Sequence, residues 1–149
     1  MKKTLSLLLA CVLLASVLGL PVLGEEALPI DLDLTDLSGT VVYAYINQMV
    51  NAPENYIGKI IRLNGWYDAF VDSSTGLYYT SCFIPDASAC CAQGIEFVWA
   101  GEHPFPEAYP EPGTGVTVTG RFEVYLEDDW MYIHLVDADV VWAEEAQAL

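Results

Sequence analysis

The sequence predicts a mostly β fold, a small five-stranded barrel preceded by one short helix. Runs rich in Ile, Val, Tyr and Trp recur from residue 60 onward and alternate with polar residues, as half-buried strands do. Gly65 and Gly120 lie inside two of these runs, where a strand serving two sides of a small barrel has to bend. Only residues 40–51 carry the spacing of an amphipathic helix.

Residues 1–24 have the features of a secretory signal peptide. Lys2 and Lys3 precede an apolar run over residues 5–20, and the small residue Gly24 marks a cleavage site that would leave Glu25 as the mature N-terminus. A transmembrane anchor is the competing interpretation, but the run falls short of the roughly 20 apolar residues that span a bilayer. We therefore expect export with cleavage, followed by secretion or association with the cell envelope.

Cys11 lies in a stretch that loosely resembles the lipobox of bacterial lipoproteins. Leu9 is bulky where that motif has a small residue, and cleavage there would leave an apolar segment shorter than a signal peptide needs. We expect Cys11 to be removed with the signal peptide.

The charge of the chain argues against nucleic acid as a partner. Loss of Lys2 and Lys3 lowers the Lys and Arg count from 5 to 3, which with 21 acidic residues gives a formal charge of −18. Binding to phosphates depends on Lys and Arg displacing counterions, so this composition excludes a phosphate-binding groove. The acidity favours solubility outside the cell, and a secondary interpretation is attraction of cations or basic partners.

The N-terminal half of the mature chain predicts a lead-in, then a helix. Residues 25–39 are acidic, and residues 29–34 alternate apolar and acidic side chains, as an edge strand or a tether would. Residues 40–51 place four apolar side chains on one helical face, with Ser38 or Thr40 as candidate N-cap. Pro53 ends this helix, because the residue before proline is pushed out of the helical conformation.

The remaining residues predict strands joined by loops. Strands are expected at residues 60–71, 77–84, 94–99, 115–125 and 130–136, and residues 138–142 either prolong the last strand or add a short sixth. Residues 103–113 contain four prolines and form a connector rather than a regular element. The domain thus covers residues 40–142, with a frayed tail at 143–149. Five or six strands with central glycines favour a Greek-key barrel of the OB type, with an open β-sandwich as the alternative.

Three segments together resemble a known group of proteins. They are residues 55–65 with their Asn-Tyr-Ile-Gly-Lys start, the Cys90-Cys91 pair after Asp86, and the alternating strand from Gly115 to Gly120. They resemble uncharacterised exported OB-like proteins of Gram-positive bacteria, and are similar to the extracytoplasmic Cys-Cys domain of a family of predicted permease partners. The resemblance covers roughly residues 55–142. It implies an OB-like fold and a protein or small ligand at the cell envelope, with a membrane permease as one such partner.

The cysteines Cys82, Cys90 and Cys91 are the foremost site candidates, and His103 is the fourth potential ligand. Three thiolates with a histidine or aspartate could hold zinc or copper(I) in a tetrahedral site. A disulfide from Cys82 to Cys90 or Cys91, with the third cysteine free, is the favoured alternative in an oxidising compartment. A redox role is the weakest, because no C-x-x-C motif is present.

The other polar residues are expected to have ordinary structural roles. His134 shares a strand face with aromatic side chains, and the acidic residues 127–129 suit a hairpin turn better than a calcium loop. No nucleophile elbow, phosphate-binding glycine loop or zincin motif occurs, so nothing in the sequence names a reaction. The sequence favours a non-catalytic binding or accessory domain, with some of its many aromatic residues forming a ligand platform.

Overall fold

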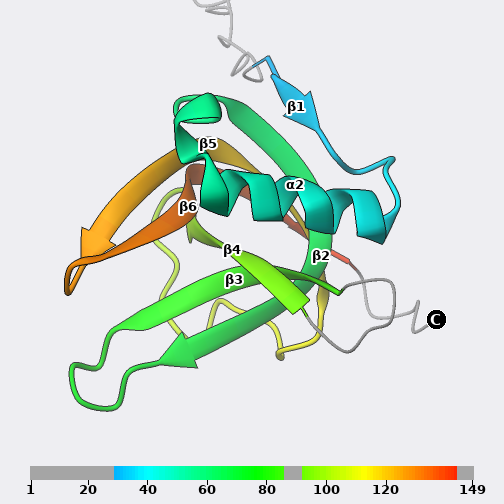
Figure 1. Ribbon diagram of the computed structural model, residues 1–149. Coiled ribbons are helices and arrows are strands. Elements are labelled where there is room, and N and C mark those ends of the chain that lie inside the picture. The colour runs from blue at the N-terminus through cyan, green and yellow to red at the C-terminus, as the bar shows by residue number, and fades with distance from the viewer. Residues whose placement is uncertain (1–28, 86–91, 144–149) are drawn as a thin grey trace, which may run out of the picture.

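A computed structural model describes residues 29–85 and 92–143 as one mixed sheet with a single α-helix in that part of the chain (Figure 1). The signal peptide predicted at residues 1–24 lies outside these ranges. The elements in chain order are β1 (Leu32–Asp33), α2 (Gly39–Asn51), the 3-10 turn η2 (Pro53–Asn55), β2 (Ile60–Val71), β3 (Tyr78–Pro85), β4 (Ala92–Trp99), β5 (Gly115–Glu127) and β6 (Trp130–Trp142).

The sheet closes on itself as a barrel-like ring. Its order is β1-β2-β3-β4-β6-β5, and β2 pairs with β5 as well as with β3. The pairs β2–β3, β3–β4, β5–β6 and β2–β5 are antiparallel, whereas β4 and β6 run parallel. A strand lies at each of the five segments where the sequence predicts one, and the short β1, paired in parallel with β2, gives the sheet six strands rather than the predicted five. Residues 138–142 prolong β6 rather than forming a separate strand.

Gly65 is the point at which β2 passes from one side of the ring to the other. Residues 60–66 of β2 pair with β5, and residues 66–71 pair with β3. A Cβ atom at Gly65 would lie 2.5 Å from the carbonyl oxygen of Phe83 and 2.7 Å from the Cys82 Sγ atom. As predicted, β2 serves two sides of the ring, and Gly65 lies where β3 approaches too closely for a Cβ atom.

A β-bulge lies opposite Gly120. The register of β5 against β6 shifts between Thr119 and Arg121, and Asp137 on β6 has a positive φ of 50°. A bulge increases the local bend and twist of a strand, which suits a sheet that has to curve into a ring.

The two ends of the ring are covered by different elements (Figure 1). Helix α2 lies across one end and buries three apolar side chains, Val42, Ile46 and Met49, which confirms the predicted helical face. At the other end, residues 100–114 place the Tyr109 ring against Tyr67 and Trp142, with centroids 6.0 and 6.3 Å apart. The core between them is apolar and includes the buried residues Ile61, Leu63, Cys82, Ile95, Phe97, Val118, Phe122 and Leu135. No helix in the described ranges is long and apolar enough to cross a membrane.

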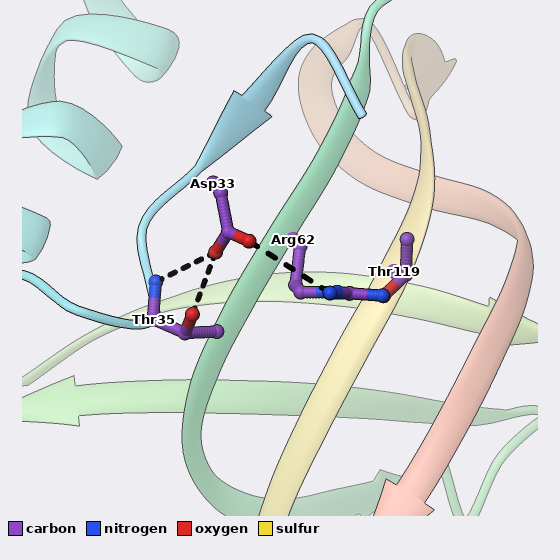
Figure 2. Close-up of polar contacts among 4 residues, drawn as sticks. All are labelled: Asp33, Thr35, Arg62 and Thr119. Carbon is purple, nitrogen blue, oxygen red and sulfur yellow. Dashed lines mark hydrogen bonds and ion pairs between the residues drawn. The ribbon is translucent and has the colours of Figure 1, made fainter. Parts of the chain in front are cut away.

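A small polar cluster fastens β1 to the ring, as Figure 2 shows. Asp33 Oδ1 accepts hydrogen bonds from the amide and the hydroxyl of Thr35, at 3.0 and 2.6 Å. Arg62 Nε donates to Thr119 Oγ1 at 3.1 Å, and an Arg62 terminal nitrogen lies 3.8 Å from Asp33 Oδ2. Arg62 thereby links the lead-in to both β2 and β5.

Asp33→Ala should lower the free energy of unfolding by about 1 kcal/mol, because two hydrogen bonds and an exposed ion pair are lost. Asp33→Asn keeps the acceptor oxygen and should cost less than about 0.5 kcal/mol. The hydrogen bonds from Thr35 lower the pKa of Asp33, so its contribution is present at neutral pH and is lost in strong acid. Urea unfolding of both variants at pH 7 checks this; equal losses for the two would show that the charge, not the turn, matters.

Candidate functional site

A cleft of about 530 Å³ lies between the two hairpins of the ring. The β2–β3 and β5–β6 hairpins extend to the same side of the molecule (Figure 1). Residues of these strands and of β4 line the cleft. We call this site the cleft. Its lining comprises residues 77–80 of the β2–β3 hairpin, residues 96–99 of β4, residues 125–127 of β5, His134 of β6, and Gly101, His103 and Tyr109 of the connector.

Two hydrogen bonds between tyrosines and glutamates cross the cleft. Tyr125 Oη donates to Glu96 Oε2 at 2.5 Å, which joins β5 to β4. Tyr79 Oη donates to Glu127 Oε1 at 2.6 Å, which joins β3 to the end of β5. Alternation along the strands explains the positions: Ile95 and Phe97 are buried inside the ring, so Glu96 between them points outward. The same two contacts hold the β5–β6 hairpin against the β3–β4 face.

The charge of Glu127 affects the pKa of Glu96, and both carboxylates affect the tyrosines that donate to them. Partial burial raises the pKa of Glu96, and the negative charge of Glu127 raises it further, while the hydrogen bond from Tyr125 lowers it. The hydrogen bond to Glu127 raises the pKa of Tyr79 to about 12. Burial, followed by the hydrogen bond to Glu96, raises the pKa of Tyr125 above its ordinary value. Both phenols therefore remain protonated donors at neutral pH.

His134 lies in the same wall of the cleft. It is paired in register with Glu96 on β4 and with Glu123 on β5, and its ring centroid lies 4.7 Å from that of Tyr125. Partial burial lowers the pKa of His134, with an opposing effect from Glu123. The His134 imidazole is thus mainly neutral at pH 7 and does not balance the charge of Glu96. The sequence identifies His134 as an ordinary half-buried strand residue, and the structure places it in the cleft.

The connector forms the other end of the cleft. The rings of His103 and Trp99 stack with centroids 3.5 Å apart, and His103 Nε2 lies 2.8 Å from the carbonyl oxygen of Ala100. Since a carbonyl can only accept, this contact places a proton on Nε2. Tyr109 meets Trp99 edge to face at 5.4 Å. His103, predicted as a possible metal ligand, is part of an aromatic stack here.

The cleft carries the negative charge of two carboxylates, and no Lys or Arg side chain lines it. Of the basic residues in the described ranges, Lys59 Nζ lies 5.3 Å from the Tyr56 ring centroid, and Arg62 pairs with Asp33. Arg121 pairs with Glu123 at 2.8 Å and with Asp137 at 2.5 Å. None of the three lines the cleft. The Glu96 and Glu127 carboxylates therefore face neutral phenols and solvent.

Cys82 is a free, fully buried thiol inside the ring. Burial raises its pKa to about 12, so it remains a protonated thiol at neutral pH, whereas metal ligation and redox exchange require the thiolate. Cys90, Cys91 and Asp86 lie outside the described residues, so the disulfide and the zinc or copper(I) site remain predictions. Within the ranges 29–85 and 92–143, no three His, Cys, Asp or Glu side chains are grouped so as to hold a metal ion.

Comparisons of the chain with protein-family models, with curated proteins and with solved structures found no match.

The residues that line the cleft were only partly anticipated by the sequence. Its aromatic residues suggest a ligand platform, and Tyr79 and Tyr125 belong to that set. Glu96 carries one local signal, an acidic residue at the outward position of a strand. Its pairing with Tyr125 spans 29 residues, and that of Tyr79 with Glu127 spans 48, so neither is visible as a motif.

Proposed function

We propose that this protein is an exported, non-catalytic binding or accessory domain of the OB type, whose ligand occupies the cleft. The observation that carries the proposal is the position of the cleft on the ring. OB barrels bind ligands on the face of their second and third strands, between the loops that join strands one to two and four to five. With β2 to β6 counted as strands one to five, that face is β3–β4 and those loops are residues 72–77 and 128–129. The cleft is lined from β3, from β4 and from residues beside both loops.

The strand connectivity supports the OB assignment. The long strands form a ring of five in the order β2-β3-β4-β6-β5, so the last two strands exchange places and β4 meets β6 in parallel. This is the crossover expected of a five-stranded Greek-key barrel, whereas the open sandwich would consist of two separate sheets. Among the strands of residues 29–85 and 92–143, closure through β2 and β5 also leaves the short β1 as an edge.

Export and the transporter partner are supported by the sequence. The basic start, apolar run and small residues at 22–24 favour passage across a membrane, and the resemblance to permease partners suggests action beside a transporter. A cleft of this volume suits a small ligand or one or two side chains of a larger partner. The acidity of the chain favours sugars, peptides or cations over nucleic acids.

Ligand binding should be detected at the Trp99 indole, which lines the cleft. We expect a ligand from a library of sugars, short peptides and amines to shift the indole N–H signal of Trp99 in two-dimensional NMR spectra. The Trp66 indole lies outside the cleft and serves as the internal control. Val98→Trp, which adds bulk at an exposed position of the lining, should weaken the binding. Failure of every library member to shift Trp99, or equal shifts of Trp66, would contradict the proposed site.

A further inference from the structure

The cleft presents two acceptor groups whose hydrogen-bonding capacity is incompletely used. Each carboxylate accepts one phenol hydrogen bond, at Oε2 of Glu96 and at Oε1 of Glu127. No other donor in the described residues reaches either group. An ionised carboxylate offers about four acceptor positions, so each retains the capacity to bind a charged donor.

The surroundings of these carboxylates select a cation over a neutral or negative group. The lining holds Glu96 and Glu127 but no Lys or Arg, and the burial that raises the pKa of Glu96 would be offset by a positive ligand. Aromatic residues of the lining, Tyr125 on β5 and Trp99 with Tyr109 near the connector, provide π faces that attract an organic cation. An anion would meet two like charges and no donor stronger than a phenol.

We propose that the cleft, if it is the ligand site of the proposed function, recognises a positively charged organic group, a protonated amine or a guanidinium. Glu96 and Glu127 act as its counterions, and the aromatic residues of the lining form the walls. A free amine and a basic side chain of a peptide share this chemistry. In either case the charged group enters between the β2–β3 and β5–β6 hairpins, while the phenols of Tyr79 and Tyr125 hold the carboxylates in place.

The test compares two probes that differ in charge and hardly in shape: acetyl-arginine amide and acetyl-citrulline amide. Titration at low salt, followed at the Trp99 indole signal, should give the arginine probe at least about ten-fold higher affinity, because a charged hydrogen bond is exchanged for a neutral one. Cadaverine, tested beside them, distinguishes a free amine from a peptide side chain. Binding of cadaverine at similar strength shows that the charge alone suffices.

Glu96→Gln keeps the shape and the acceptor for Tyr125 but removes the charge, and should lower the affinity for the arginine probe about ten-fold. Asp139→Asn removes the same charge from an exposed residue of β6 outside the lining, and should leave the affinity within about two-fold. Equal affinities for the two probes, or equal losses in the two variants, would overturn the cation inference. In that outcome a shift of Trp99 by citrulline or a sugar still supports a ligand site, whereas no shift by any probe overturns the proposed function as well.

Discussion

Gly65→Ala is expected to lower the free energy of unfolding by about 3 kcal/mol, at the upper end of what overpacking usually costs. The added methyl would lie 2.5 Å from the Phe83 carbonyl oxygen and 2.7 Å from Cys82 Sγ. The first neighbour is backbone and the second is a fully buried side chain, so neither can move without opening the β2–β3 pairing. Because β2 changes partner at this residue, the strain would spread to its pairing with β5 as well.

Equilibrium unfolding in urea measures this loss, and Asn64→Ala is the matched control. Asn64 is the preceding residue of the same strand, but its side chain is exposed, so its replacement should change the free energy of unfolding by less than about 0.5 kcal/mol. A loss below about 1 kcal/mol for Gly65→Ala would mean that β2 can bend without the close approach to β3.

Cys82→Ser is expected to cost about 2 kcal/mol, because it places a hydroxyl in an apolar interior where the thiol has no need of a hydrogen bond. Cys82 is fully buried, and its neighbours across the sheet, Tyr67 and Ile95, are buried too. Cys82→Ala removes one atom without adding a polar group and should cost about 1 kcal/mol. The difference in free energy of unfolding between the two variants measures the cost of burying the serine hydroxyl.

Because the Cys82 thiol is buried, we expect the protein to lose stability at alkaline pH. Burial holds the pKa of Cys82 near 12 in the folded chain, whereas a thiol in the unfolded chain titrates near 9. The unfolded state therefore releases its proton first, so the contribution is complete below pH 9 and declines from pH 9 towards pH 12. Between pH 9 and 10 the decline should be weaker in Cys82→Ala, which separates the effect of Cys82 from that of tyrosines, whose ordinary pKa is higher.

Thiol counting links this result to the disulfide predicted between Cys82 and Cys90 or Cys91. If Cys82 is a protonated core residue, it should react with a thiol reagent only after denaturation. A mass about two daltons below that of the fully reduced chain, with Cys82 as one of the two bonded cysteines, would instead support the predicted disulfide. Rapid reaction of Cys82 in the native protein would contradict its burial.

The elements of this fold could be predicted because they depend on local patterns. Residues 40–51 form a helix because their apolar side chains recur at helical spacing, and the structure differs only in starting at Gly39. Runs of strand-forming residues marked the five long strands, with clean alternation at residues 115–125. Gly65 predicted the point where β2 serves two sides of the ring, and the structure shows that no larger residue fits there. The proline-rich connector was expected to be irregular, but nothing in it predicted that Tyr109 would close one end of the ring.

The site was harder to predict because its contacts join distant strands. Cys82 drew attention as a reactive group, yet alternation along β3 turns it into the core together with Thr80 and Ile84. Glu96 and Glu127 carry no motif, and they become neighbours only because β4 pairs with β6 in parallel and the β5–β6 hairpin curves over the β3–β4 face.

By itself, then, the sequence determined the strongly acidic charge, the mostly β composition with one helix, and the places where the chain turns, because these follow from residue type and short-range periodicity. Tertiary structure alone decided which outward-facing residues meet. Ring closure brings together Tyr79 with Glu127 and Glu96 with Tyr125, and it buries the thiol of Cys82. Such pairings depend on strand order and curvature, which are set by long-range packing of the whole ring.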